Sequence, residues 1–286
     1  MSAHRDVTAV TPERVYFLPH PALRKIVSHY TVYTPNPAAR AGRKPERLHL
    51  VPDASGCIVC PLTEIPSAPI LWGPMSRVAA VEKNAAQIPL YVFAEFLPAG
   101  AHRLLGLPMH SLENARLPLA DVDPELAAAV ARDFDRTHRE GRRPDSASFL
   151  DALDRLFLAR AGRTEHSHLA DFILASVSAE RGAVRVGELA ARTGYSERHL
   201  ARVTAERLGL GIKSLSRIVK INNACAMMAT GGLSLTALAH GLGYHDQSHF
   251  IRDFRETCGI APGAYLDGMS DFYNEGLKMT GTMPEK

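Results

Sequence analysis

The sequence has few cysteines and no long apolar run, and both absences limit the classes of protein that it can encode. Four cysteines in 286 residues are too sparse for the disulfide framework of a small secreted protein. No apolar run approaches the roughly 18–20 residues of a membrane-spanning helix. The polar start at residues 1–6 leads into no apolar segment of a signal peptide. We therefore expect a cytoplasmic protein with no membrane segment.

Motifs for catalysis and metal binding are also missing from the sequence. There is no Ser/His/Asp arrangement, no glycine-rich phosphate loop and no pair of catalytic carboxylates. The His-x-His pair at His166 and His168 is followed by no suitably spaced glutamate, and it falls in a predicted interdomain joint. The sequence thus predicts a protein that is not an enzyme and has no catalytic residues, no bound metal and no cofactor.

Cys57 and Cys60 form a C-x-x-C sequence that has two interpretations. The β-branched run at 57–59 predicts a strand, in which positions i and i+3 face opposite sides of the sheet. Both cysteines would then be structural, and this is the interpretation that we favour. A turn at this place would instead let the two thiols share a metal or form a redox disulfide. The alternative prediction is therefore a redox- or metal-responsive protein.

The net charge of +3 hides a contrast between two segments. Residues 181–220 contain nine Lys or Arg and three acids, a net charge of +6, whereas residues 221–268 contain two Arg and four acids, a net charge of −2. A basic segment in a nearly neutral chain indicates a surface that faces phosphates, although charge runs are also common on solvated helices.

The first half of the sequence predicts a β-rich domain. Short apolar runs alternate there with proline and glycine, and the run at 90–97 is rich in aromatic and β-branched residues. The expected strands lie at 26–33, 47–51, 56–60, 69–71 and 90–97.

Two amphipathic helices are expected after these strands. One begins at Asp123-Pro124, with aspartate as N-cap and proline in the first turn, and the other runs from Ser146 to Arg160. Their apolar stripes fit either the core of the protomer or a dimer contact. From about residue 163 the sequence is helical in character, and 161–167 is the expected joint. We therefore expect an α+β chain with domains at 1–160 and 165–268 and a tail at 269–286.

An internal repeat organises the C-terminal part. The sequence VGELA at 186–190 followed by Gly194-Tyr195 recurs as LTALA at 235–239 followed by Gly243-Tyr244, at a shift of 49. After one inserted residue the match continues at a shift of 50, with the pairs Leu200/Phe250, Arg202/Arg252, Glu206/Glu256 and Gly209/Gly259. Each copy predicts a helix, a tight turn at glycine and a second helix, with Ser196 and Asp246 as N-caps.

The predicted helix between the two copies sets their separation. It runs from about 213 to 230, which corresponds to about 27 Å at 1.5 Å per residue. If the second helix of each copy is held about one DNA turn, about 34 Å, from the other, the two helices can enter successive major-groove segments of one duplex.

This repeat resembles the DNA-binding domain of the AraC/XylS family of transcription regulators. The resemblance is carried by GYHDQSHFIRDFR at 243–255, GIAP at 259–262 and Tyr265, and it extends over roughly 167–267. It implies two tandem helix-turn-helix units that bind double-stranded DNA.

The N-terminal half resembles the cupin-like sensor domain that precedes this DNA-binding domain in some family members. The similar segments are LVPD at 50–53, WGP at 72–74, FLPAGA at 96–101 and LLGLP at 104–108. The resemblance implies a small-molecule effector of unidentified chemistry. Trp72, Tyr91 and His49 are candidates for contacting it, although a core role is the favoured interpretation for the two aromatic residues.

The second helix of each repeat supplies the predicted base contacts. In the first repeat Leu200 points inward, so Arg198 and Arg202 share the outer face of the second helix and both can reach guanine. Arg202 could instead touch phosphate or pair with Glu206. The predicted base-contacting residues are Glu197, Arg198, Ala201, Arg202, Gln247, Ser248, Ile251 and Arg252. The predicted contacts with the DNA backbone come from Ser196, Lys213, Arg217, Lys220 and Arg255.

The sequence as a whole predicts a transcription regulator that binds specific DNA under the control of an effector in its N-terminal domain. A homodimer is expected from the family resemblance and the helices at 124–160, and RNA polymerase is a further candidate partner. Two alternatives remain: the redox- or metal-responsive regulator that uses Cys57 and Cys60, and a cupin-type enzyme fused to a DNA-binding module. The absence of a metal motif argues against the enzyme.

Overall fold

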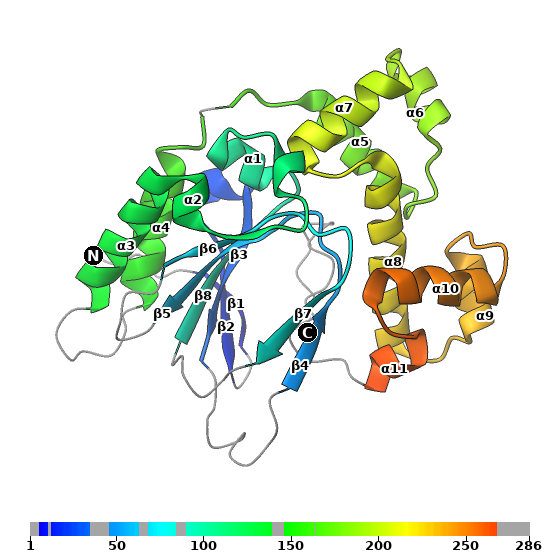
Figure 1. The fold of residues 1–286 in the computed structure, drawn as a ribbon, viewed down its shortest axis with the longest axis horizontal. Coiled ribbons are helices and arrows are strands. Elements are labelled where there is room, and N and C mark those ends of the chain that lie inside the picture. Colours follow the sequence, from blue (N-terminus) through cyan, green and yellow to red (C-terminus); the bar gives the residue numbers. More distant parts are fainter. Residues whose placement is uncertain are drawn as a thin grey trace.

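The chain folds into a β-rich N-terminal part and a helical C-terminal part that lie side by side (Figure 1). The computed structural model describes residues 6–10, 13–34, 46–62, 68–83, 90–138, 146–162 and 164–267. The predicted α+β class is confirmed, whereas the predicted tail at 269–286 lies outside the described residues. No helix in the described ranges is both long enough and apolar enough to cross a lipid bilayer.

Antiparallel pairing joins strands that are far apart in the sequence. Within the described residues, the larger sheet has seven strands in the order β1-β2-β3-β8-β5-β6-β9, and β4 pairs with β7 in a separate sheet. The strands are β1 (Val7–Val10), β2 (Arg14–Phe17), β3 (Val27–Tyr33), β4 (Glu46–Leu50), β5 (Cys57–Leu62), β6 (Ile70–Trp72), β7 (Ala79–Lys83), β8 (Leu90–Phe96) and β9 (Arg116–Pro118). The five predicted strands correspond to β3, β4, β5, β6 and β8.

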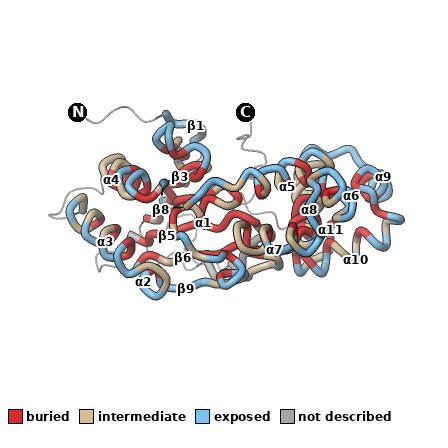
Figure 2. The backbone as a smooth tube through the Cα atoms, turned by 90° about the horizontal axis from the view of Figure 1, so that it is seen from above, coloured by how far each residue is buried: buried red, intermediate tan, exposed pale blue. Residues whose placement is uncertain are grey.

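One face of the larger sheet packs against helices to form the main core. Tyr30 of β3, Ile58 of β5 and Phe96 of β8 are buried there with Phe149 and Phe157 of α4. The helices of this part are α1 (Gly100–Leu105), α2 (Leu119–Val122), α3 (Pro124–His138) and α4 (Ser146–Leu158), with the 3-10 turns η1 (Pro21–Leu23) and η3 (Met109–Leu112). Figure 2 shows the buried residues gathered along β3, β5 and β8.

The opposite face of the same sheet carries a second cluster of buried side chains. Cys57, Val59, Trp72 and Met75 form this inner-face cluster, and Tyr91 and Phe93 pack against it. Along β5 the alternate residues Ile58 and Cys60 belong to the main core instead. The strand interpretation of the C-x-x-C sequence is therefore confirmed, because its two cysteines lie on opposite sides of the sheet.

The two predicted amphipathic helices are α3 and α4, and their apolar stripes are buried within the protomer. Leu126, Val130 and Phe134 of α3 pack with Phe149 and Leu153 of α4 in the main core. The stripes thus serve the core, and a dimer contact at these helices would have to use their outer faces.

The start of α3 is fixed by the aspartate that the sequence predicts as its cap. The Leu126 amide donates a hydrogen bond to Asp123 Oδ1 at 2.8 Å. The same carboxylate forms an ion pair with Arg160, whose side chain is 9% exposed while that of Asp123 is 15% exposed. This pair ties the chain after α4 to the start of α3.

The C-terminal part consists of helices arranged around one long central helix. They are α5 (His168–Ala179), α6 (Val186–Thr193), α7 (Glu197–Leu208), α8 (Ile212–Thr230), α9 (Leu235–Gly241), α10 (Gln247–Cys258) and α11 (Pro262–Asp267). In Figure 1, α8 runs between the group formed by α5, α6 and α7 and the group formed by α9, α10 and α11.

We expect Asp123→Ala to lower the free energy of unfolding by about 3 kcal/mol, because it leaves the buried Arg160 guanidinium without its main partner and removes a helix cap. Urea denaturation of the full chain measures this. Arg136→Ala is the control, since its ion pair with Asp133 on α3 is exposed on the arginine side, and it should change stability by less than about 0.5 kcal/mol. Equal effects of the two substitutions would contradict a structural role for the Asp123–Arg160 pair.

Candidate nucleic-acid interface

The first predicted unit is a helix-turn-helix formed by α6 and α7. Gly194 ends α6 at a φ of 72°, a conformation that favours glycine. Ser196 then caps α7, because its side chain accepts a hydrogen bond from the His199 amide at 3.2 Å. Leu189 of α6 and Leu200 of α7 are buried in one core. The predicted turn, cap and packing pair are all confirmed.

The second unit repeats this arrangement with α9 and α10. Gly243 has a φ of 73°, and Asp246 caps α10 by accepting a hydrogen bond from the His249 amide at 2.7 Å. This hydrogen bond, together with one from His245, lowers the pKa of the exposed Asp246 carboxyl. Leu238 and Phe250 are buried together, as predicted.

The connecting helix α8 belongs to the cores of both units. Its first half contributes Leu215, Ile218 and Val219 to the core of the first unit, and its second half contributes Ile221 and Ala224 to that of the second. With 19 residues it is about 29 Å long, close to the predicted length. One rigid element therefore fixes the separation of α7 and α10.

The outer face of α7 presents the predicted residues of the first unit to solvent. Glu197, Arg198, Ala201 and Arg202 are all exposed. Arg202 pairs with Glu206 at 3.3 Å, in agreement with one of the two predictions for this residue. An exposed pair of this kind contributes little to stability, so Arg202 can exchange Glu206 for another acceptor at small cost.

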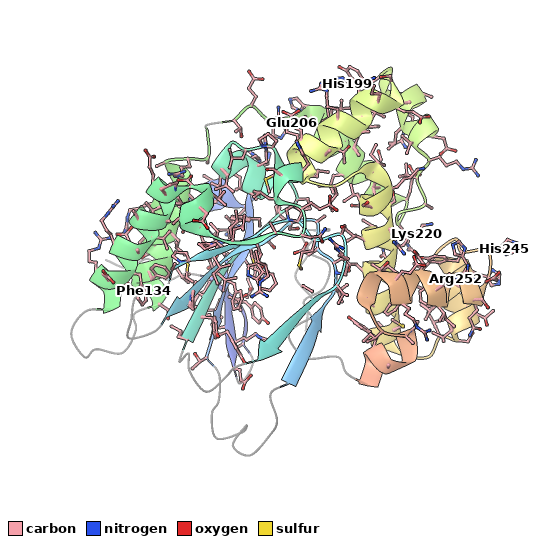
Figure 3. All side chains as sticks on the ribbon, viewed as in Figure 1. Phe134, His199, Glu206, Lys220, His245 and Arg252 are labelled. Carbon is pink, nitrogen blue, oxygen red and sulfur yellow. The ribbon has the colours of Figure 1, made fainter. Side chains whose placement is uncertain are left out.

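The outer face of α10 is less fully available. Ser248 and Arg252 are exposed, and Figure 3 shows Arg252 on the part of α10 away from the β domain. Gln247 Oε1 accepts a hydrogen bond from the Thr236 hydroxyl at 2.7 Å. Ile251 is partly buried against the core of the second unit. The outer face of α10 therefore has mainly one serine and one arginine free to contact a ligand.

The residues predicted to contact the DNA backbone fall into two groups. Ser196, Lys213 and Arg255 are exposed. Lys220 instead has its ammonium group 5.2 Å from the centre of the Tyr244 ring, and Arg217 is held between two carboxylates.

The Arg217 contacts form a network that joins α8 to α10. Arg217 Nε donates to Asp253 Oδ1 at 2.5 Å, and its Nη2 donates to Glu256 Oε2 at 2.6 Å. The Tyr244 hydroxyl donates to the second oxygen of Asp253 at 2.6 Å. Burial and the neighbouring Asp253 carboxylate raise the pKa of Tyr244. Arg217 of the first segment offsets part of the charge of these two acids of the second, so the charge contrast between 181–220 and 221–268 overstates the contrast between the two surfaces.

Tyr195 is a candidate contact residue that the sequence did not indicate. It lies in the turn before α7, is 49% exposed and stacks on His199 with the ring centres 4.6 Å apart. Its repeat partner Tyr244 is buried at 6% exposure. The repeat could have singled out this position, but equivalent positions of the two copies lie in different environments.

The effector candidates lie in or beside the inner-face cluster. Trp72 is buried, and the Arg116 guanidinium lies 4.1 Å from the centre of its ring. Tyr91 is half-buried and stacks between Tyr33 and Phe93. The side chain of His49 lies outside the described part of the structure.

Cys57 and Cys60 do not form a shared site. Both thiols are buried, on opposite faces of β5, and burial raises the pKa of Cys60 to about 12. No cluster of three or more His, Cys, Asp or Glu suited to a metal ion occurs among the residues that the structure describes. The arrangement thus argues against the redox or metal alternative at these two cysteines.

The β domain contacts both helix-turn-helix units. At the end of α7, Arg207 Nη1 donates to His102 Nε2 at 2.8 Å and to the Glu165 carbonyl at 3.1 Å. Next to it, a side-chain carbon at Gly209 would lie 2.7 Å from Pro74 Cγ and 2.9 Å from the Met109 carbonyl oxygen. This close approach requires glycine at position 209.

A second contact reaches the other unit. The Val78 amide donates to the Thr257 carbonyl in α10 at 3.0 Å, and Val51 is buried within the core of the second unit. The segment 73–78, which follows Trp72, therefore approaches the first unit through Pro74 and the second through Val78.

Residues 189–268 match the family described as helix-turn-helix domain. Together with the geometry of the two units, this match shows that the C-terminal part of the chain contains a helix-turn-helix domain, a class of DNA-binding domain. Comparison with curated proteins gives no match.

The solved structures that are similar to this chain include the following three. The C-terminal domain of AraT, a response regulator from Geobacillus stearothermophilus, is 18% identical, with 38% of this chain and 93% of that chain covered and a TM-score of 0.35. An apo variant of ToxT from Vibrio cholerae is 14% identical, with 84% and 97% covered and a TM-score of 0.46. Wild-type ToxT with bound unsaturated fatty acid is 14% identical, with 85% and 90% covered and a TM-score of 0.39.

We expect Arg217→Ala to lower the free energy of unfolding by about 1–3 kcal/mol, because it leaves Asp253 with a single partner, Tyr244. Lys213→Ala, at an exposed position near the start of the same helix, should change it by less than about 0.5 kcal/mol. Urea denaturation followed by circular dichroism compares them. If the two variants are equally stable, the Arg217 network does not hold α10 to α8.

Proposed function

We propose that this chain is a transcription regulator that reads specific DNA with two helix-turn-helix units placed on one duplex. The observation that carries the proposal is the exposure of Arg198 and Arg202 on α7, and of Arg252 on α10, in two units fixed to one helix of 19 residues. Two recognition helices held in this way suit successive major-groove segments.

The two surfaces have different roles in this proposal. Arg198 and Arg202 supply the principal base readout, because arginine binds the O6 and N7 atoms of guanine with two hydrogen bonds. Glu197 and Ala201 lie beside them on α7. In the second unit Arg252 and Ser248 contact the DNA directly, Gln247 reads adenine after releasing Thr236, and Ile251 contributes a smaller apolar contact.

Contacts with the DNA backbone supply affinity that depends on salt but not on sequence. Ser196, Lys213 and Arg255 take this role because they are exposed. Arg217 and Lys220 are already engaged within the protein, so they contribute indirectly by holding the second unit in place.

The effector acts through the inner-face cluster of the β domain. Trp72 belongs to this cluster, and the segment 73–78 that follows it approaches both units, at Gly209 and at Thr257. A ligand that displaces Trp72 or Tyr91 therefore moves the segment that contacts both units. Such a movement changes the position of α7 and α10 relative to the β domain, and therefore the affinity of the protein for DNA.

A second copy of the chain and RNA polymerase are further partners in this proposal, which places the protein in the cytoplasm. The apolar stripes of α3 and α4 are used in the protomer core, so the dimer contact is assigned to the outer faces of these helices.

We expect Arg202→Ala to weaken binding to the specific operator by about 1–3 kcal/mol, which is about a 5- to 150-fold loss, without unfolding the protein. The operator is first identified from genome-wide DNA occupancy, and affinity is then measured by fluorescence anisotropy. Arg136→Ala, at an exposed arginine of the β domain, is the matched control and should bind normally. Unchanged affinity in Arg202→Ala would remove this residue from the readout surface.

We also expect the contact between His102 and Arg207 to weaken in acid. His102 Nδ1 donates to the Leu107 carbonyl at 2.8 Å, which leaves Nε2 as the acceptor for Arg207. Burial and then the Arg207 charge lower the pKa of His102 below 6.5, although the Leu107 carbonyl and Glu206 oppose this shift. The stabilising contribution is therefore complete above about pH 6.5 and is lost as the pH falls through the lowered pKa of the folded state.

The urea midpoints of the wild type and of His102→Gln, measured between about pH 7.5 and about pH 5.5, check this expectation. Glutamine keeps an oxygen acceptor for Arg207 at every pH, so the wild type should lose more stability on acidification than the variant. Parallel pH profiles would show that His102 does not titrate against this contact.

A further inference from the structure

An exposed tyrosine and a partly buried histidine lie together at the start of the first recognition helix. The Tyr195 ring stacks on the His199 ring, with the ring centres 4.6 Å apart and the ring planes 14° from parallel. The Tyr195 amide donates to Thr193 Oγ1 at 3.4 Å. The His199 amide donates to Ser196 Oγ at 3.2 Å. Because these hydrogen bonds fix the backbone of both residues, the stacked pair has a defined place at the end of α7 that carries the predicted base contacts.

The stacked histidine holds one side of the Arg202 guanidinium. Arg202 Nη2 lies 3.4 Å from His199 Nδ1, and since arginine only donates hydrogen bonds, Nδ1 is the acceptor. On the other side, Arg202 Nη1 donates to Glu206 Oε2 at 3.3 Å. The two partners lie three residues before and four residues after Arg202, spacings that share one face of a helix. Figure 3 shows both partners on α7, with Glu206 nearer to the β domain.

Arg202 can keep both of these contacts while it binds a base. A guanidinium has five N–H groups in a rigid planar fork, two on each terminal nitrogen and one on Nε. His199 and Glu206 use one N–H of each terminal nitrogen, so one remains on each. Two such donors match the O6 and N7 atoms of guanine. A side chain that is ordered before binding loses less conformational entropy on binding, so this arrangement favours readout by Arg202.

The repeat supplies the same residue types to the second unit but uses them differently. His249 packs edge-on against the buried Tyr244, with the ring centres 5.2 Å apart. Glu256 binds Arg217 of α8. Among the residues that the structure describes, neither His249 nor Glu256 forms a hydrogen bond or ion pair with Arg252. The recognition arginine of the first unit is therefore held in place in the free protein, whereas its counterpart in the second unit is not.

We infer that Tyr195 and His199 are positioning residues that orient Arg202 for guanine readout by the first unit. Tyr195 acts by stacking on His199, and His199 acts by accepting the hydrogen bond from Arg202. Arg198, on the same outer face, forms no hydrogen bond or ion pair within the described part of the chain, so it serves as the matched control. This role rests on the proposed function, and the experiments below therefore separate the failure of one from the failure of the other.

The first experiment measures the affinity of the full-length protein for the operator duplex by fluorescence anisotropy. His199→Phe keeps a ring on Tyr195 but removes the acceptor for Arg202, and we expect affinity to fall by about two- to tenfold. Tyr195→Ala removes the stacking partner and should also weaken binding by about two- to tenfold, whereas Tyr195→Phe keeps the ring and should bind normally. Circular dichroism verifies that each variant is folded.

The second experiment combines His199→Phe with an alanine at either arginine. A residue that acts through Arg202 should cause no further loss in the Arg202→Ala background, but it should cause its full loss in the Arg198→Ala background. Selection from a library of randomised duplexes gives a readout that a merely structural role would not move. Arg202→Ala and His199→Phe should weaken the preference for guanine at the same position of the selected site, and Arg198→Ala should leave that position unchanged.

Three results would overturn the positioning role while the proposed function stands. They are normal affinity in both His199→Phe and Tyr195→Ala, full additivity of His199→Phe with Arg202→Ala, and an equal loss in Tyr195→Phe and Tyr195→Ala, which would assign the contact to the tyrosine hydroxyl. A wild type that selects no sequence from the library would overturn both. Tyr195 is 49% exposed, so its two variants decide the matter even where His199→Phe folds poorly.

Discussion

The packing of both recognition helices on the single helix α8 is the constraint on which the rest of the structure depends. The first half of α8 completes one apolar core with α6 and α7, and its second half completes another with α9 and α10. Because a continuous helix is stiff, these two cores fix the separation of the exposed arginine faces. Loss of either core would leave two independent units with no defined spacing on a duplex.

Different interactions hold the two helix-turn-helix units in place. The first unit relies on leucine packing, and its recognition helix ends against the β domain through Arg207 and Gly209. The second adds a polar network around Asp253. An ion network responds to solution conditions more readily than an apolar core does, so the second unit is the more adjustable of the two.

Much of the fold was accessible from the sequence because its signals are local. Helix starts at Pro124 and Glu197 follow residues whose side chains cap the first turn, and the alternation along 57–60 follows from the pleat of a strand. The short strands β1, β2, β7 and β9 were not predicted. Their pairing partners, rather than their own three to five residues, make them strands.

The sequence by itself determined the two helix-turn-helix units, their glycine turns, their caps and the polar face that each recognition helix offers, because each depends on residues within one or two helical turns. Only the tertiary structure decided which of these residues are available. Arg217 is bound by acids about forty residues away, and Tyr195 is exposed where its repeat partner is buried. The tertiary structure also brought the segment after Trp72 to both units, since contacts between distant segments follow from how the helices and sheet pack.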